Sequence, residues 1–513
     1  MKSPDAFYIT TAIAYPNGRP HMGHAYEVVA TDAIARFHRL DGKAVTFLTG
    51  TDEHGLKIAQ AARAAGVAPK AYVDAQVGAF LDMAATFGIS HDRFIRTTDA
   101  DHVAASQALW RAMVAAGDIY LDRYTGWYSV RDEAYYDESE LVDATDAAGQ
   151  AVRLSPQGTA VEWTVEESWF FRLSAYADRL LTWYDEQPGC VAPPSRMNEM
   201  RAFIERGLRD LSISRTSFDW GVPVPDGEPG APPHVMYVWV DALTNYLTGA
   251  GYPGAGYDAI WPADLHVIGK DVVRFHAVYW PAFLMSAGIA LPKRVFGHGF
   301  ILDRGEKMSK SLGNVVDPAE LAASLGVDRL RWYMLAGVVF GDDGNYSHAA
   351  IVERTNADLA NGIGNLAQRS LSMIAKNCGG AMPAVGEGDP ALATILAAQA
   401  AIYHQEMTAL RLNRGLDAVM AMVTAANAYF ADAAPWSLKA SDPARMAAVL
   451  ATTVDAVRRI AILVQPVVPA AAALLLDQLG VAADARNFAG LDRVVAPGTP
   501  LPPPVGIFPR WVE

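Results

Sequence analysis

Apolar and polar residues alternate near the N-terminus in a strand–helix–strand pattern. Residues 7–13 are rich in β-forming residues and predict a buried strand. From His21 to Leu40, apolar residues recur at helical spacing, and Asp41-Gly42 predicts the end of that helix. A second apolar run, 45–48, follows. This spacing predicts a βαβ unit and therefore a parallel sheet in an α/β fold.

Further along, the pattern changes twice, and this predicts several domains. An aromatic and acidic stretch rich in Gly and Pro reads as an insertion, after which strand-like runs return at 237–240 and 265–268. The last third is Ala-rich and helical, which predicts a helical bundle. The expected divisions are the first half of an α/β domain, an insertion, the second half of that domain, a connecting region, and a helical domain with a C-terminal tail, at 1–115, 116–230, 231–298, 299–352 and 353–513.

Composition adds two constraints on function. Hydrophobic residues make up 51% and charged residues 19% of the chain, which is typical of a globular protein with several cores. The formal net charge of −14 disfavours nonspecific nucleic-acid binding, although only a contact face has to be basic. The two cysteines, Cys190 and Cys378, allow no disulfide framework and no C-x-x-C metal site.

The apolar segments do not indicate export or a membrane span. Near the N-terminus, Thr10 and Thr11 interrupt the apolar run that a signal peptide would need. The apolar stretch 460–476 is broken by Gln465, Pro466 and Pro469 and is too short to cross a bilayer. We therefore expect a cytoplasmic protein without membrane association.

The segment Pro20-His21-Met22-Gly23-His24 lies at a predicted strand-to-helix junction. The N-terminus of a helix offers free N–H groups and a positive dipole end to phosphate. His21 and His24 share one helix face, so both imidazoles can donate to phosphate oxygens, and Gly23 leaves room for a flat ring. Taken alone, however, an H-x-x-H pattern also arises by chance.

A second polar segment, 306–313, contains Lys307 and Lys310 among hydroxyl residues. Ammonium groups on a loop can neutralise a departing pyrophosphate. By itself the segment is equally typical of a solvated surface loop.

Together, His21-Met22-Gly23-His24 and Lys307-Met308-Ser309-Lys310-Ser311 resemble the H-I-G-H and K-M-S-K-S signatures of class I aminoacyl-tRNA synthetases. The second matches fully, and the first differs only by Met22. The resemblance implies a Rossmann-like parallel-sheet catalytic domain split by an insertion and followed by an α-helical anticodon-binding bundle. It also implies ATP with Mg²⁺ as the nucleotide. The implied catalytic residues are His21, His24, Lys307, Lys310 and Arg215. The implied ATP-binding residues are His21, Gly23, His24, Gly269, Asp271, Lys307, Met308, Ser309, Lys310 and Ser311.

The flanking segments indicate the amino acid. Residues 12–18, 50–55, 237–242 and 266–276 are similar to methionyl-tRNA synthetases, and the similarity extends over essentially the whole chain. It implies that Asp52 binds the α-ammonium group of L-methionine and that Asp271 holds the ribose hydroxyls of ATP. Apolar and aromatic side chains suit a polarizable thioether. The residues implied to form or border this pocket are Ile13, Tyr15, Trp239, Ala242, Leu243, Tyr246, Val272 and His276.

Structural interpretations stand beside these roles. Trp239 and Tyr246 are seven residues apart and can be ordinary core aromatics, and Asp52 can cap a helix. Relatives for leucine, isoleucine and valine carry a larger insertion, and a cysteine-specific relative would need zinc-binding thiols that this chain lacks. Methionine is the substrate that fits.

The helical C-terminal part resembles the family's anticodon-binding bundle. Asn365 and Arg369 are four residues apart on one helix face, and Trp436 follows Ala434-Pro435. The resemblance implies that these three residues bind the CAU anticodon of tRNA(Met), Trp436 by stacking on a base. Packing within the bundle is the structural alternative for Trp436. A chain without the extra tRNA-binding domain of dimeric relatives is expected to be a monomer.

Two other classes of function remain open. A nucleotidyltransferase could share the sheet and the phosphate motif without using tRNA, but residues Asn365, Arg369 and Trp436 argue against it. A noncatalytic tRNA-binding paralogue is disfavoured by the intact motifs.

The insertion departs from the family at its metal site. Many methionyl enzymes carry C-x-x-C zinc knuckles, where this chain has Ser129 and Asp132 and, for the second pair, the segment 154–158. These residues cannot form a tetrahedral thiolate cage, so we predict no structural zinc and an insertion held by hydrogen bonds and aromatic contacts.

Metal analysis of the purified protein should accordingly find no stoichiometric zinc, and a chelator should leave its melting temperature unchanged. One zinc per chain, with the insertion unfolding on chelation, would contradict this prediction.

Overall fold

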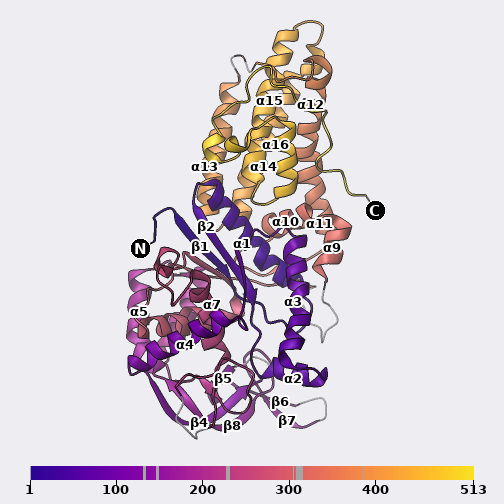
Figure 1. Cartoon of the computed structure of the whole chain (residues 1–513). Coiled ribbons are helices and arrows are strands. Elements are labelled where there is room, and N and C mark those ends of the chain that lie inside the picture. Colours follow the sequence, from indigo (N-terminus) through magenta and orange to yellow (C-terminus); the bar gives the residue numbers. More distant parts are fainter. Residues whose placement is uncertain are drawn as a thin grey trace. The chain divides into compact units, whose positions relative to one another are not determined.

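In the computed structural model the chain forms two compact units (Figure 1). The first unit comprises Met1–Pro20, Thr46–Asp82 and His91–His298, and the second comprises His21–Val45, Met83–Ser90 and Gly299–Glu513. The structure describes residues 2–130, 134–145, 149–226, 232–303, 305–307, 316–384, 386 and 388–512.

A six-stranded sheet forms the centre of the first unit. Its order is β3 (Arg93–Arg96), β2 (Ala44–Thr51), β1 (Ala6–Thr11), β13 (Leu265–Gly269), β14 (Val295–His298) and β9 (Val191–Ala192). The β2–β3, β1–β13, β13–β14 and β14–β9 pairs are parallel, and a parallel bridge joins Ala14 to Thr51 next to β1 and β2. The α/β parallel sheet predicted from the sequence is confirmed, as are the predicted strands at 7–13, 45–48 and 265–268.

Helices pack around this sheet and bury a continuous apolar core. α4 packs against α7 and α8, and α6 packs against β9. The helices of the first unit are α2 (Leu56–Ala64), α4 (Ala100–Ala115), α5 (Ala177–Glu186), α6 (Pro194–Glu205), α7 (Val238–Ala250) and α8 (Trp280–Ser286). The helix α3 (Pro69–Thr86) contributes residues to both units.

The prediction of a strand at 237–240 is wrong. Val238 begins the helix α7, which ends at Gly251 in a left-handed conformation with φ 94°. Nearly all of α7 is buried, including Val238 and Val240. A helix buried all round has no polar face, so its periodicity is hidden, and packing overrides the strand preference of its valines.

A separate antiparallel sheet lies within the predicted insertion. Its order is β10 (Leu211–Ser212), β8 (Glu162–Phe171), β4 (Ile119–Ser129) and β5 (Ala134–Tyr136). β4 and β8 pair from Ile119↔Phe171 to Tyr128↔Glu162. Two further pairs are β6 (Val142–Thr145) with β7 (Ala151–Leu154) and β11 (Ser214–Arg215) with β12 (Val235–Met236). The same stretch of chain also supplies β9 to the parallel sheet.

The second unit contains α1 (Met22–Leu40), a small sheet and a helical bundle. The sheet order is β16 (Glu306–Lys307), β15 (Ile301–Asp303) and β17 (Gly344–Tyr346). The bundle helices run alongside one another in Figure 1; α14 packs against α13 and α15, and α15 also packs against α16 and α12. The remaining helices are α9 (Pro318–Leu325), α10 (Val327–Ala336), α11 (His348–Thr355), the π-helix η7 (Asn356–Gly364), α12 (Asn365–Asn377), α13 (Pro390–Thr408), α14 (Leu412–Ala433), α15 (Pro443–Val464) and α16 (Pro469–Gln478). Within the described part of the chain, no helix has the length and hydrophobicity needed to cross a bilayer.

Two histidines lie in the core of the first unit. His266 is fully buried on β13, and its Nδ1 lies 2.7 Å from Thr10 Oγ1. His276 is 1% exposed and donates from Nδ1 to the Val272 carbonyl at 2.9 Å. Its Nε2 therefore accepts the hydroxyl of Tyr246 at 2.6 Å. Burial lowers the pKa of both histidines, that of His276 to about 4 and that of His266 well below its usual value.

These shifts predict how stability depends on pH. The unfolded chain binds protons to these imidazoles near pH 6.5 while the folded chain excludes them, so stability is full above pH 6.5 and is lost toward pH 4. The variant His276→Gln keeps a donor and an acceptor but does not titrate. Urea unfolding at pH values between 6.5 and 4.5 gives the free energy of unfolding as a function of pH. The slope of this free energy against pH should be smaller in the variant than in the wild type, by up to about 1.4 kcal/mol per pH unit. An unchanged slope would mean that His276 titrates in the folded state.

Candidate functional site

The strands that carry the predicted methionine residues end at one edge of the parallel sheet. Ile13 and Tyr15 follow β1, Asp52 follows β2, and Gly269 ends β13. β1 pairs with β2 on one side and β13 on the other, so the chain order reverses at β1. Ligands of open α/β sheets bind beyond the carboxyl ends of the strands at such a reversal.

Asp52 is held by the backbone at this edge. Its N–H donates to the Ala14 carbonyl at 2.9 Å, and the residue is 7% exposed. The next residue, Glu53, is fully buried and receives two hydrogen bonds from Arg96 at 2.6 and 2.9 Å. Trp220 donates from Nε1 to the Glu53 carbonyl at 2.7 Å. These contacts fix the loop that carries the Asp52 carboxylate.

A second buried carboxylate holds the same loop from α7. Asp241 is fully buried between His54 Nδ1 and His102 Nε2, each 2.6 Å from one carboxylate oxygen. Burial would raise the pKa of Asp241, but the two histidines outweigh it and lower the pKa to about 2. An ionised Asp241 thus joins the loop after β2 to α7 and α4.

The same helix, α7, presents the predicted aromatic and aliphatic residues of the pocket. Trp239, Ala242, Leu243 and Tyr246 recur at helical spacing, and the last three are almost fully buried. Trp239 stacks on Phe275, with ring centroids 3.8 Å apart and planes 5° apart.

His276, in the short π-helix Phe275–Tyr279, also contacts this cluster. Its ring centroid lies 5.6 Å from that of Tyr246 and 6.1 Å from that of Trp239. The Val272 carbonyl and the Tyr246 hydroxyl fix its tautomer. The fold thus assembles Trp239, Tyr246, Val272 and His276, which are separate in sequence, into one contiguous group.

Asp271, the predicted ribose-binding residue, is exposed in the short helical turn Lys270–Val272 directly after β13. A side chain at Gly269 would place its Cβ 2.7 Å from Asp271 Oδ1. Glycine at 269 therefore leaves the space that the carboxylate occupies.

Arg215 is buried rather than presented on the surface. It is 2% exposed and donates from Nη1 to the carbonyl of Ser214 at 2.5 Å. Its guanidinium carbon lies 4.6 Å from the ring centroid of Tyr237 and 5.4 Å from that of Tyr128. The structure gives Arg215 a packing role, and its catalytic role stays a prediction.

In the second unit, the two histidines of the first motif cap α1. His21 is the N-cap residue, and its Nδ1 accepts the Gly23 N–H at 3.0 Å. His24 Nδ1 accepts the His21 N–H at 3.1 Å, and the ring centroids are 4.0 Å apart. Because both Nδ1 atoms accept, each neutral imidazole carries its proton on Nε2 and is a donor. A Cβ at Gly23 would lie 2.9 Å from His21 Cε1, so glycine makes room for this ring.

The second motif is only partly within the described residues. Lys307 ends β16, whose backbone pairs with β15 through Leu302. Met308, Ser309, Lys310 and Ser311 lie outside the described residues.

Two of the predicted anticodon residues, Arg369 and Trp436, lie against each other, and the third, Asn365, lies on the same helix as Arg369. Asn365 begins α12, and Arg369 lies one turn later. The Arg369 guanidinium carbon is 5.4 Å from the ring centroid of Trp436 and 5.0 Å from that of Phe430. Trp436 is 49% exposed. An exposed indole beside a cation is a suitable surface for stacking an unpaired base.

Hydroxyl groups occupy the place of the zinc knuckle in the insertion. Ser129 Oγ and Ser155 Oγ each lie 2.8 Å from Thr159 Oγ1, and all three residues are buried. Trp127 packs edge-on against Trp163, with the ring centroids 5.2 Å apart. Within the described ranges no group of three or more His, Cys, Asp or Glu is arranged to hold a metal, and Asp132 lies outside those ranges.

Several residues of the site were missed by the sequence analysis. Phe275 lies inside a quoted motif and could have been found there, as the only aromatic residue between Val272 and His276. His102 and Arg96 carry no motif of their own. Only their contacts with Asp241 and Glu53 reveal them.

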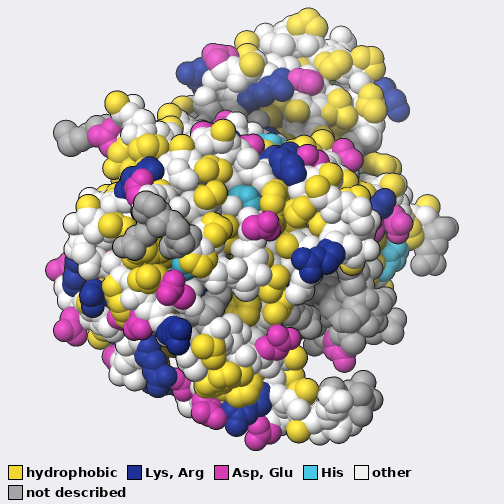
Figure 2. Space-filling model, turned by 60° about the horizontal axis from the view of Figure 1, so that its bottom comes forward, with side chains coloured by type: hydrophobic (Ala, Val, Ile, Leu, Met, Phe, Trp, Pro, Cys, Tyr) yellow, Lys and Arg dark blue, Asp and Glu magenta, His cyan; other side chains and the backbone are white. Residues whose placement is uncertain are grey.

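Charged side chains of both signs are interspersed over the face shown in Figure 2. This distribution accompanies the net charge of −14. An RNA contact on this face would therefore depend on local cations rather than on the bulk charge.

Comparison with known proteins identifies the family of the chain. The family model for class I tRNA synthetases (M) matches residues 7–371, and that for the anticodon-binding domain of methionyl tRNA ligase matches residues 380–509. The methionine–tRNA ligase of Mesorhizobium japonicum is 58% identical over 518 residues, covering 100% of this chain and 99% of that protein. The Brucella suis enzyme is 56% identical with the same coverage.

Solved structures give the same result. The Mycobacterium tuberculosis methionyl-tRNA synthetase in complex with methionyl-adenylate superposes with a TM-score of 0.94 at 55% identity, covering 99% of this chain and 100% of that one. The chain therefore belongs to the methionyl-tRNA synthetase family of class I aminoacyl-tRNA synthetases and is a methionine–tRNA ligase.

Proposed function

We propose that this ligase joins L-methionine to the α-phosphate of ATP at the sheet edge and then transfers it to tRNA(Met) with a CAU anticodon. The observations that support the proposal are the position of Asp52 directly after β2, at the carboxyl edge of the parallel sheet, and the single aromatic group formed by Trp239, Tyr246 and His276. A carboxylate suits the ammonium group of methionine, and an apolar aromatic group suits its thioether.

In the first step, the methionine carboxylate attacks the α-phosphate of ATP, and pyrophosphate leaves. Asp52 holds the ammonium group, and Ile13, Tyr15, Trp239, Ala242, Leu243, Tyr246, Val272 and His276 surround the side chain. Because the substrate supplies the nucleophile, the protein contributes mainly orientation and charge stabilisation.

The nucleotide is held by residues of both motifs. Nε2–H groups of His21 and His24 donate to phosphate oxygens, while Gly269 and Asp271 hold the adenosine ribose. Lys307 and Lys310 stabilise the departing pyrophosphate, and Arg215 supports the negative charge. Met308, Ser309 and Ser311 bind ATP beside these lysines, and Gly23 leaves room for the flat ring of the nucleotide. Mg²⁺ binds mainly through nucleotide phosphates and water, so it needs no cage of protein side chains.

In the second step, the methionyl group moves to the terminal ribose of the tRNA, with Asn365, Arg369 and Trp436 binding the anticodon.

The chain acts as a monomer in the cytoplasm. Its domains are the two catalytic halves 1–115 and 231–298, the zinc-free insertion 116–230, the stem-contact region 299–352 and the anticodon-binding domain 353–513.

Two assays on the wild-type protein test this function. Methionine-dependent exchange of pyrophosphate into ATP measures the first step, and charging of tRNA(Met) measures the second. Exchange without charging would indicate a nucleotidyltransferase, and tRNA binding without exchange would indicate a noncatalytic paralogue. Either result would overturn the proposal.

The variant Asp52→Asn should weaken methionine binding selectively. Asparagine keeps the shape of the side chain but loses the charge that pairs with the ammonium group. Loss of a charge-assisted hydrogen bond of about 1.5–3 kcal/mol should raise the KM for methionine roughly 10- to 150-fold. The KM for ATP is the internal control, and an equal rise in both constants would contradict this role.

The variant Trp436→Ala should weaken tRNA without affecting the first step. Loss of one base-stacking contact should cost about 1–3 kcal/mol in tRNA binding. The expected readout is a raised KM for tRNA with unchanged pyrophosphate exchange. As a control, the exposed Trp163 of the insertion can be changed to alanine, which should leave anticodon discrimination intact. Normal discrimination against altered anticodons in Trp436→Ala would exclude Trp436 from the interface.

A further inference from the structure

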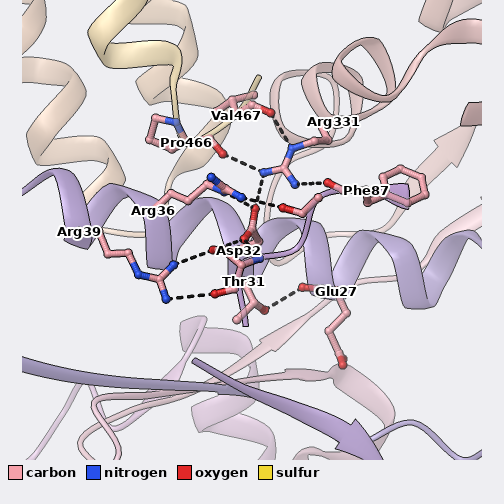
Figure 3. A network of polar contacts seen from close by, with 11 residues as sticks. Glu27, Thr31, Asp32, Arg36, Arg39, Phe87, Arg331, Pro466 and Val467 are labelled. Carbon is pink, nitrogen blue, oxygen red and sulfur yellow. Dashed lines mark hydrogen bonds and ion pairs between the residues drawn. The ribbon is translucent and has the colours of Figure 1, made fainter. Parts of the chain in front are cut away.

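A fully buried arginine of α10 joins separate segments of the second unit (Figure 3). Arg331 donates from Nε to the Val467 carbonyl at 2.8 Å and from Nη1 to the Phe87 carbonyl at 3.0 Å. Its Nη2 donates to the Pro466 carbonyl at 2.9 Å and to the Asp32 carboxylate at 2.6 Å. One guanidinium thus holds α1, the segment that includes Phe87, and the turn between α15 and α16.

The carboxylate of this pair is fully satisfied. Asp32 Oδ1 accepts the N–H and the hydroxyl of Ser90 at 2.7 and 2.6 Å, and Oδ2 accepts Arg36 Nε at 2.8 Å as well as Arg331. Burial would raise the pKa of Asp32, but Arg331 and Arg36 outweigh it and hold the pKa below its usual value. The Asp32–Arg331 pair is therefore ionised, and hydrogen bonds to other groups fix the orientation of both side chains.

α10 also holds the bundle at a second point. Asp328, one turn before Arg331, accepts the Ala471 N–H at 2.7 Å in the first turn of α16. First-turn N–H groups have no partner within their own helix, so this carboxylate caps α16. α10 thus fixes both the turn at Pro466 and Val467 and the helix that follows it.

Two uninterrupted helices extend from this junction. α15 runs back from the turn to Pro443, and the candidate anticodon residue Trp436 lies just before it. α1 contains Asp32, and its N-cap His21 lies about three turns earlier, roughly 16 Å along the axis. Regular helices move as stiff elements, so a shift at the α15–α16 turn can be carried to the imidazoles of α1 by the groups that hold the two helices together.

We propose that Arg331 is a positioning residue that transmits anticodon binding from the helical bundle to the phosphate-binding end of α1. The proposal rests on the proposed function. The chain of contacts runs from Trp436 along α15 to the carbonyls of Pro466 and Val467, through Arg331 to Asp32, and along α1 to His21. Arg331 touches no substrate in this scheme and acts through Asp32.

The variant Arg331→Lys tests this role. Lysine keeps a positive charge for Asp32 but has a single nitrogen, which cannot bond all the carbonyls that the planar guanidinium reaches. Methionine-dependent pyrophosphate exchange without tRNA should stay near the wild-type rate. The kcat/KM for tRNA charging should fall about tenfold, within the usual range of coupling energies, and a tRNA with an altered anticodon should be penalised less than by the wild type.

Arg458→Lys is the matched control. Arg458 is also almost fully buried, donates to the carbonyls of Gly490 and Leu491 at 2.8 and 2.7 Å, and pairs with Asp455. Asp455 lies in α15, and Gly490 and Leu491 follow α16, so none of these hydrogen-bond partners belongs to α1. Loss of Arg458 should therefore cost stability without loss of anticodon discrimination.

Several outcomes would overturn the inference. An equal loss of exchange and charging in Arg331→Lys would reveal a purely structural role, and unchanged discrimination between anticodons would remove the coupling. A wild-type protein that fails the exchange or charging assay would instead refute the proposed function, before any variant is compared.

If Arg331→Lys does not fold, hydrogen exchange on the wild type gives the answer. Binding of an RNA hairpin with a CAU loop should slow exchange of the amides in the first turn of α1. Binding of the hairpin without any change in these amides would overturn the proposal.

Discussion

Charge buried away from water has to be matched by hydrogen-bond donors, and this constraint organises both units of the protein. Glu53, Asp241 and Asp32 are each fully buried, and each meets at least two donating side chains. Removing one partner of a buried pair typically costs about 3–5 kcal/mol, because the other charge is left uncompensated. Such pairs add little net stability, but they favour the arrangement of segments that brings both partners together.

In the first unit this constraint fixes the loop that carries Asp52, the residue proposed to bind the methionine ammonium group. A carboxylate in that proposed role needs a position that is set by its neighbours. Glu53 with Arg96, and His54 with Asp241, supply that support on either side of the loop. In the same unit, burial lowers the pKa of His276 to about 4, and hydrogen bonds to the Val272 carbonyl and the Tyr246 hydroxyl fix its tautomer. An uncharged aromatic group of this kind suits an apolar side chain.

The sequence predicted the parts of the fold that depend on local pattern. The strands that became β1, β2 and β13 were bounded by turns and by an amphipathic helix, so periodicity was sufficient. α7 was misassigned because burial on all sides removes the polar face on which periodicity depends. Trp239 and Tyr246 could still be named from their motif, although the motif does not reveal their secondary structure.

The supporting residues could not be predicted, for a different reason. His102 and Asp241 are far apart in the sequence, and neither carries a pattern that points to the other. Arg331 reads as one more polar residue of an amphipathic helix, yet it is fully buried. A long-range pair of this kind is set by the tertiary fold, which brings distant segments together, and becomes visible only when the fold is known.

An acidic chain that binds RNA has to separate specific from nonspecific attraction. Bulk negative charge repels the phosphate backbone and suppresses binding at random positions. Affinity must then come from contacts that do not rely on the overall field, such as stacking on an exposed indole. Arg369 is placed against Trp436 and Phe430, so its charge is presented next to the aromatic surface rather than spread over the protein. A ligand that offers an unpaired base together with its phosphate can use both features, whereas a duplex, with its bases already stacked, can use only the charge. In the proposed role of Arg369 and Trp436, this combination would favour a single-stranded loop, as the anticodon is, over duplex nucleic acid.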